Sequence, residues 1–153
     1  MTTTANKVSE AEWAARVQLA AAYRIFDHLG WGELIYNHIS MRVPGPDAHF
    51  LLNPFGLHYS EVRASNLVKV DVRGNVIGHR DWPINPAGFT FHGKIHETLP
   101  DAHCVMHVHT TPTMAVCCLG EGLSGREGRV RQRGAAVPEA AASSSSTACC
   151  TAL

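Results

Sequence analysis

The segment that decides the fold covers residues 101–111, Asp101-Ala102-His103-Cys104-Val105-Met106-His107-Val108-His109-Thr110-Thr111. Apolar residues alternate with others along it, a pattern that predicts a β-strand. Because side chains two positions apart leave the same face of a strand, we expect His107 and His109 to project together. Two imidazoles about 7 Å apart on one face can turn their nitrogen atoms toward one ion. The segment is therefore a candidate metal-binding strand that supplies two ligands.

A His-x-His strand also has a simpler interpretation, in which both histidines hydrogen-bond to neighbouring groups or to water. Zinc takes three protein ligands at a catalytic site and four at a structural one, so two histidines do not complete a site. The strand by itself leaves both interpretations open.

The composition is that of an ordinary globular domain. The chain has 153 residues, of which 45% are hydrophobic and 17% charged, enough for one domain and too few for two. Its formal net charge is zero at pH 7, so we expect neither a nucleic-acid partner nor insertion into a membrane. All ten histidines fall between His28 and His109.

The cysteines and the N-terminal residues indicate a cellular location. The five cysteines include two adjacent pairs and no Cys-x-x-Cys, which predicts neither a disulfide framework nor a zinc ribbon. The first residues lack the apolar core of a signal peptide, and no apolar run is long enough to cross a bilayer. A reducing cytoplasm is the expected location.

An amphipathic helix is predicted over residues 10–29. Ser9 and Glu12 have the spacing of a capping box, in which each side chain binds the backbone amide of the other residue. Gly30 stands where a helix C-terminal glycine belongs. Apolar residues recur at four-residue spacing, at Trp13, Val17, Ala21, Ile25 and Leu29. The aromatic residues of the helix are expected to pack in the core, namely Trp13, Tyr23 and Phe26.

Strands and two shorter helices are expected to follow. Alternation and turn residues predict strands at residues 36–43, 49–53, 67–71 and 76–79, with a short helical turn at 61–65. Asn85 is a good N-cap, and Pro86 suits the first position of a helix that ends before Pro100. A last short helix is predicted over residues 113–119. This order predicts an α+β or a three-layer α/β/α domain.

The composition changes after residue 124. Residues 125–153 contain no aromatic and almost no large aliphatic side chain, so burial cannot offset their ordering entropy. Their arginines lack interleaved aromatics, which favours a solvated tail over a nucleic-acid patch. The Gly-x-Gly-x-x-Gly match at 120–125 follows a helix, so it does not predict nucleotide binding. We expect a disordered start (1–8), an incomplete domain (9–124) and a disordered tail from an out-of-frame reading or premature end (125–153).

Several strings of the chain, taken in order, resemble the class II aldolase/adducin family. They are Tyr36-Asn37-His38-Ile39-Ser40-Met41-Arg42, Leu52-Asn53-Pro54-Phe55-Gly56, Leu67-Val68-Lys69-Val70-Asp71, Asn85-Pro86-Ala87-Gly88-Phe89 and Pro100-Asp101-Ala102-His103-Cys104-Val105-Met106-His107-Val108-His109-Thr110. The resemblance covers about residues 10–124. It implies a truncated α/β/α three-layer domain with a central, mostly antiparallel sheet, assembled as a homo-oligomer.

The resemblance also implies a chemistry. In the aldolases of this family the His-x-His strand supplies two of three zinc ligands, and His107 and His109 are similar to these. The zinc polarises a small sugar-derived carbonyl substrate while a carbon–carbon bond breaks or forms. By the same resemblance, substrate-binding roles are expected for Asn37, His38, Gly56 and Asn85.

The chain departs from the aldolase pattern at three places. The catalytic Glu that lies four residues before the histidine matching His92 is Gly88 here. The hydroxyl residues that hold phosphate in the sugar-phosphate aldolases are replaced by Pro86, Ala87 and Phe55. The third zinc histidine comes well downstream in the family, and no histidine follows His109 in this chain. His92 or His96 could approach as a third ligand, or could be hydrogen-bonded core histidines.

Two functions are compatible with these features. The first is a fragment of a zinc-dependent class II aldolase-like protein of carbon–carbon lyase lineage, inactive as this fragment. The alternative is a non-catalytic adducin-like module for self-association or binding to the actin cytoskeleton, which the Asn-Pro-Ala-Gly-Phe string favours. A third interpretation, which the tail suggests, is that the chain is an inert truncated product.

Overall fold

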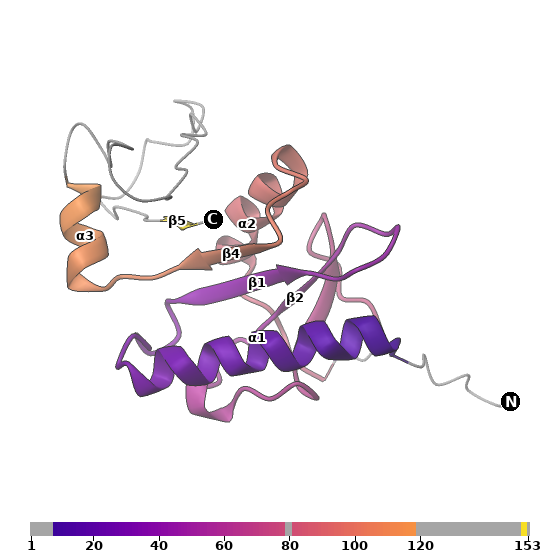
Figure 1. Cartoon of the computed structure of the whole chain (residues 1–153), viewed down its shortest axis with the longest axis horizontal. Coiled ribbons are helices and arrows are strands. Elements are labelled where there is room, and N and C mark those ends of the chain that lie inside the picture. Colours follow the sequence, from indigo (N-terminus) through magenta and orange to yellow (C-terminus); the bar gives the residue numbers. More distant parts are fainter. Residues whose placement is uncertain (1–7, 79–80, 119–150, 153) are drawn as a thin grey trace, which may run out of the picture.

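The computed structural model describes residues 8–78, 81–118 and 151–152 (Figure 1). In chain order its elements are α1 (Glu10–His28), β1 (His38–Arg42), β2 (His49–Leu52), the 3-10 helix η1 (Tyr59–Glu61), β3 (Val68–Asp71), α2 (Pro86–Thr98), β4 (Cys104–His107), α3 (Thr111–Cys117) and β5 (Thr151–Ala152). The expected disordered start and tail lie outside the described residues, except for Val8 and β5.

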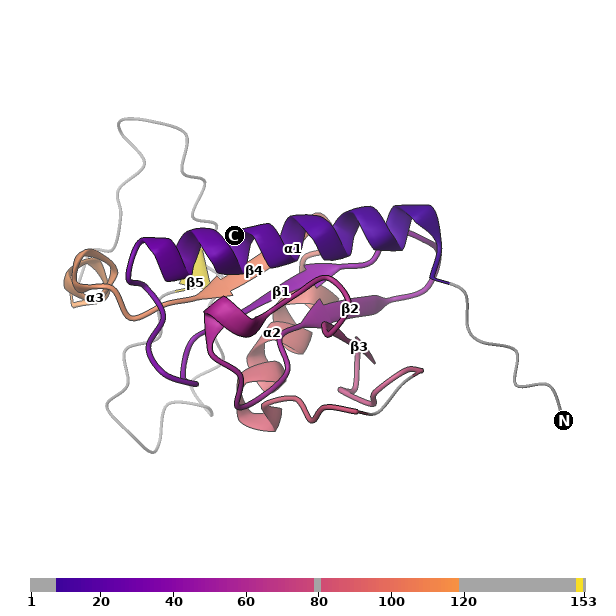
Figure 2. The ribbon, with the colours of Figure 1, turned by 90° about the horizontal axis from the view of Figure 1, so that it is seen from below.

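A sheet with antiparallel pairing forms the middle layer, in the order β3-β2-β1-β4-β5. Figures 1 and 2 show α1 along one face of this sheet and α2 against the other. The prediction of an α/β/α domain with a mostly antiparallel sheet is confirmed. Among the described residues, no helix combines the length and apolar character needed to cross a bilayer.

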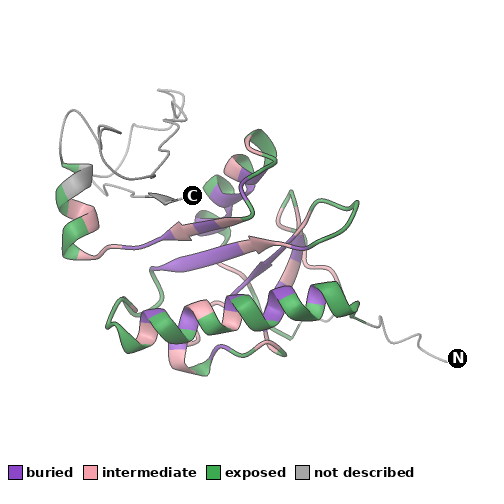
Figure 3. Ribbon diagram, in the orientation of Figure 1, coloured by how far each residue is buried: buried purple, intermediate pink, exposed green. Residues whose placement is uncertain are grey.

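Each face of the sheet has its own apolar core. On one face, α1 packs with Ile39 of β1 and Leu51 of β2. On the other, Phe89 of α2 packs with Phe50 and Leu52 of β2. Because side chains alternate along a strand, a strand covered on both faces buries residues of both rows, and β2 does so (Figure 3).

The start of α1 carries one half of the expected capping box. Ser9 Oγ accepts a hydrogen bond from the Glu12 amide at 3.1 Å. A capping box also requires the Glu12 carboxylate to accept from the Ser9 amide. Instead, that carboxylate accepts from Arg16 Nε at 2.9 Å and from Lys69 Nζ at 2.8 Å. Burial by itself raises the pKa of Glu12, but the hydrogen bonds from Lys69 and Arg16 outweigh it and lower the pKa. The two cations thus keep a buried carboxylate ionised.

The apolar row at four-residue spacing lies on the outer side of α1. Its large side chains are about half exposed: Trp13 47%, Val17 49%, Ile25 56% and Leu29 48%. The expectation that Trp13 packs in the core is therefore wrong, whereas Tyr23 and Phe26 do pack there. A constant four-residue step drifts about 40° around a helix each time. Leu19, Tyr23 and Phe26 combine steps of four and three, so they stay on the side that faces the sheet.

Other differences from the predicted elements arise at caps and turns. The helical turn begins at Tyr59, two residues before the predicted range, because His58 and Glu61 form a capping box there. Of the expected strand at 76–79, residue 79 lies outside the described residues. Residues 76–78 make one bridge, from Val70 to Val76, and Gly78 has φ +85°. The last helix begins at Thr111 because Thr110 provides the cap, its Oγ1 accepting from the Thr113 amide at 3.4 Å.

The two faces of α1 can be distinguished by matched truncations. Leu19 is fully buried, so Leu19→Ala should lower the free energy of unfolding by about 2–5 kcal/mol. Val17→Ala on the outer side should change it by about 0.5 kcal/mol or less. Urea unfolding followed by circular dichroism measures both. Equal losses in the two variants would show that the row containing Val17 also packs against protein.

Candidate functional site

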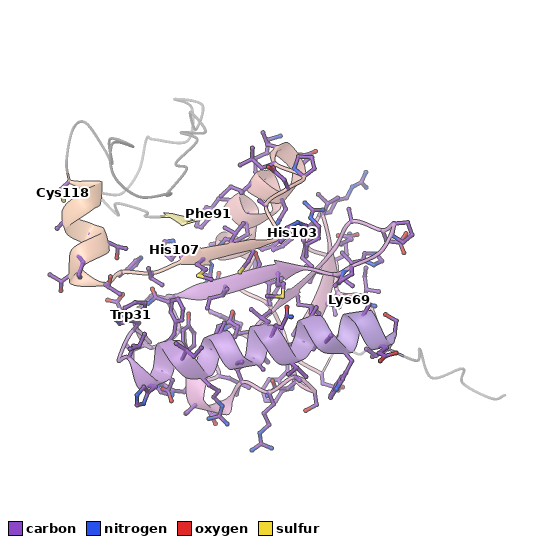
Figure 4. The ribbon with its side chains drawn as sticks, viewed as in Figure 1. Trp31, Lys69, Phe91, His103, His107 and Cys118 are labelled. Carbon is purple, nitrogen blue, oxygen red and sulfur yellow. The ribbon has the colours of Figure 1, made fainter. Side chains whose placement is uncertain are left out.

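The two histidines of the His-x-His segment converge at the end of β4. Their Nε2 atoms lie 2.7 Å apart, and their ring centroids are separated by 4.6 Å. His107 is buried on the same side of β4 as Val105, and His109 follows just after the strand. Figure 4 shows His107 at the end of the sheet where Trp31 also lies. The His-x-His spacing thus brings the two Nε2 atoms together, although His109 lies beyond the end of β4.

Glu33, which was not among the predicted site residues, pairs with His109. Glu33 Oε2 lies 2.7 Å from His109 Nδ1. A carboxylate only accepts, so Nδ1–H donates, and in the neutral ring the lone pair is left on Nε2. Metal-binding histidines commonly donate their second N–H to a carboxylate in this way. Glu33 follows the turn Gly30-Trp31-Gly32. In the local sequence, only the position of a carboxylate beside this glycine-rich turn could have pointed to its role.

His38 lies beside His107 on the neighbouring strand. The β1–β4 register sets the two residues opposite each other, and their rings stack at 4.8 Å with an interplanar angle of 13°. Phe91 of α2 lies 5.9 Å from both rings. His107 is therefore held between a parallel imidazole and the ring of His109.

Behind His38 lies a chain of buried hydrogen bonds, which we call the Ser40 network. It consists of His38, Ser40, His92, His96 and the carbonyl oxygen of Ala102. The successive distances are 2.8 Å for His38 Nδ1–His92 Nε2, 2.6 Å for His92 Nδ1–Ser40 Oγ, 2.8 Å for Ser40 Oγ–His96 Nε2 and 3.0 Å for His96 Nδ1–Ala102 O. His92 and His96 are thus hydrogen-bonded core histidines. Within residues 8–78, 81–118 and 151–152, no three His, Cys, Asp or Glu side chains are grouped so as to hold a metal ion.

Burial keeps these imidazoles neutral. It lowers the pKa of His38 to about 3, of His92 to about 2, and of His96 and His107 to about 4. Neighbouring imidazoles lower the pKa of His38, His92 and His107 further, because two protonated rings would repel each other. A neutral imidazole keeps a lone pair available for an ion or for a hydrogen bond.

A cavity of about 350 Å³ opens beside His109. The turn at residues 30–33, Asn37 and residues 110–112 complete its lining. Asn37 Nδ2 donates to the Trp31 carbonyl at 2.8 Å, while the buried Asn37 Oδ1 has no partner among the described residues. The cavity is of a size that takes small ligands, and it brings Asn37 close to the pair of histidines.

The other two residues expected to bind substrate have different surroundings. Gly56 lies in the turn after β2 with φ +96°, and the neighbouring Phe55 amide donates to the Pro83 carbonyl at 2.9 Å. Asn85 caps α2, its Oδ1 accepting from the Gly88 amide at 3.2 Å. The structure thus gives both positions a role in the backbone, and their contact with substrate stays a prediction.

The donors at the end of β4 suit zinc as a pair. The 2.7 Å contact between the two Nε2 atoms is a hydrogen bond, so one of them carries a proton that a bound ion would displace. Nitrogen ligands about 2.0–2.1 Å from a tetrahedral zinc ion lie roughly 3.3 Å apart, so the two Nε2 atoms would also separate by roughly 0.6 Å. Imidazole nitrogens, with a carboxylate behind one of the rings, are the chemistry that a zinc site uses. The described residues therefore fit two ligands of such a site.

Comparisons with known proteins identify relatives of this chain. The family model for the class II aldolase and adducin N-terminal domain matches residues 17–147, a range that runs into the expected tail. A Caulobacter vibrioides protein named for class 2 aldolases is 55% identical over 118 residues, 77% of this chain and 46% of that protein. Rat alpha-adducin is 47% identical over 116 residues, 74% of this chain and 16% of the adducin.

A solved structure of an aldolase is also similar to this chain. The L-fuculose 1-phosphate aldolase from Glaciozyma antarctica PI12 superposes with a TM-score of 0.69 at 32% identity, covering 81% of this chain and 51% of the aldolase. The chain thus spans about half the length of that enzyme and of the Caulobacter protein.

The buried histidines should make the fold sensitive to mild acid. Their pKa values in the folded state lie below the ordinary 6.5, so the unfolded chain takes up protons first as the pH falls. Their contribution to the free energy of unfolding is fully present above about pH 6.5. Below that pH the free energy of unfolding falls by at most about 1.4 kcal/mol per histidine for each pH unit. Urea unfolding at pH 7.5 and 5.5, with a metal chelator present, should show the loss. Equal free energies at the two pH values would contradict it.

Proposed function

The chain belongs to the class II aldolase and adducin family, and from that premise we propose that it is the N-terminal part of a zinc-dependent, aldolase-like protein. Its substrate in the intact parent would be a small sugar-derived carbonyl compound. The observation that carries this proposal is the pair of facing Nε2 atoms of His107 and His109, with Glu33 behind His109.

Each residue near the pair has a part in the proposed site. His107 and His109 would hold the ion, which when bound would polarise a carbonyl oxygen and stabilise the charge that develops there. Glu33 holds the His109 ring with Nε2 facing His107. The cavity beside His109 has room for the substrate, and Asn37 is one of the residues that line it.

Two features support the proposal that this chain has no lyase turnover by itself. The position that matches the catalytic carboxylate of the family's aldolases is Gly88, and the His38 ring fills the space beside it. A Cβ atom on Gly88 would lie 2.5 Å from His38 Nε2. Among the described residues, no third side chain joins the pair to complete a metal site, and His92 and His96 are engaged in the Ser40 network.

Zinc binding tests the proposed site. We expect isothermal titration calorimetry to detect zinc binding by the 153-residue chain. His107→Ala should weaken binding by more than tenfold, since it removes a ligand, and Glu33→Gln by about 10–100-fold, since it removes the group that orients His109.

His103→Ala is the matched control, because this exposed histidine precedes β4 in the same segment. It should leave zinc affinity unchanged. The proposed site would be refuted by zinc binding that is as strong in His107→Ala as in the parent sequence.

A second candidate function, favoured by the outer side of α1, is a non-catalytic module that works by self-association, as in the adducin branch, or by binding the actin cytoskeleton. The helix exposes an apolar row at Trp13, Val17, Ile25 and Leu29. Such a row buries apolar surface when a second helix packs on it. Gly88, which carries no acid or base group, is equally compatible with this module.

Substitutions on the apolar row test this second function. Trp13→Gln combined with Ile25→Gln should shift sedimentation velocity profiles toward the monomer by at least tenfold in dissociation constant, because apolar contact area is lost. Arg24→Gln, on the exposed surface of the same helix, is the control. A metal-free chain that self-associates through this row would favour the module, and unchanged association in the double variant would exclude self-association through this row.

A further inference from the structure

The direction of every hydrogen bond in the Ser40 network follows from its last member. The Ala102 carbonyl oxygen only accepts, so His96 Nδ1 carries a proton and donates to it. His96 is neutral, so its Nε2 has a lone pair and accepts the hydroxyl proton of Ser40. These two assignments leave no freedom at the serine.

The remaining members follow in turn. A hydroxyl has one proton, so Ser40 Oγ must accept from His92 Nδ1–H. Neutral His92 then has its lone pair on Nε2 and accepts from His38 Nδ1–H. All three histidines are thus protonated on Nδ1, and His38 Nε2 carries an unshared lone pair.

The contact between His38 Nε2 and α2 explains the glycine at position 88. A Cβ added there would lie 2.5 Å from Nε2 and 2.7 Å from Cδ2 of the His38 ring. The first turn of α2 can pack against this ring only where residue 88 has no side chain. The Ser40 network therefore fixes the tautomer of His38. The close packing of α2 at Gly88 limits the plane of the His38 ring.

We propose that Ser40, His92 and His96 are positioning residues that fix the His38 ring, and through its stacking fix the His107 ring at the site. The link to zinc rests on the proposed function. The fixing of the two rings does not, because it follows from the hydrogen bonds and the 4.8 Å stacking alone. His38 acts in this arrangement as the parallel surface that keeps His107 Nε2 turned toward His109.

Nitrogen-15 NMR of histidine-labelled, metal-free protein at pH 7.5 tests the proposal, because nitrogen shifts distinguish the two imidazole tautomers. In the unsubstituted chain, His38, His92 and His96 should all show the Nδ1–H form. Ser40→Ala breaks the network in its middle. His92 and His38 should then become tautomer mixtures and His107 should shift, whereas His96, still bonded to Ala102, should not change.

Two further variants separate positioning from general loss of structure. Ser40→Thr keeps the hydroxyl and should restore the tautomers of His38 and His92. Gly88→Ala should displace His38 and shift His107, while His92 and His96 keep their bonds to Ser40. Thr90→Ala, which removes an exposed hydroxyl of α2, is the control and should change none of these signals.

Zinc affinity is the second measurement. Ser40→Ala and Gly88→Ala should weaken zinc binding by about 10–100-fold, as expected for groups that orient a ligand, and Ser40→Thr should restore it. An Nε2–H form of His38 in the unsubstituted chain, or tautomers of His38 and His92 that do not respond to Ser40→Ala, would overturn the proposal. Absence of zinc binding in the unsubstituted chain would instead overturn the proposed function, because the NMR pattern is recorded without metal.

Discussion

The antiparallel register between β1 and β4 is the constraint on which the rest of the structure depends. It places His38 beside His107 and Ser40 beside Val105, with all four side chains on the face that α2 covers. Because side chains alternate across a strand, a slip of one residue would send His38 and Ser40 into the apolar core under α1. Ile39 fills that core and would have to take their place among the histidines. The register is therefore specified by polar residues on one face and apolar ones on the other.

The α2 face of the sheet is divided into an apolar half and a polar half. Phe50 and Phe89 belong to the first half, and the Ser40 network occupies the second. Burying imidazoles without partners would cost several kcal/mol, so the network is stable only when each member finds its neighbour. The ring of Phe50 stacks on His96 at 4.4 Å, so the two halves are in contact there. A polar interior of this kind favours one packing of α2 over others.

The two candidate functions differ in what they need from this scaffold. An aldolase-like role uses the open end of β4, where His107, His109 and Glu33 meet beside a cavity. A self-association role uses the outer side of α1, across the sheet from the Ser40 network. Gly88 bears on the first role alone, because a carboxylate there would have to displace the His38 ring. The chain thus pairs two imidazole nitrogens at the end of β4 and places the His38 ring beside Gly88.

The sequence by itself determined whatever depends on neighbours along the chain. The bounds of α1 and α2, the Asn85 cap and the convergence of His107 with His109 all follow from helical caps and from the two-residue period of a strand. Tertiary structure alone decided which side of α1 faces the sheet, that Glu12 pairs with Lys69, that Glu33 supports His109, and that Ser40 links two histidines of α2. Those partners come from segments far apart in the chain, and a hydrogen bond has no period in the sequence by which it could be found.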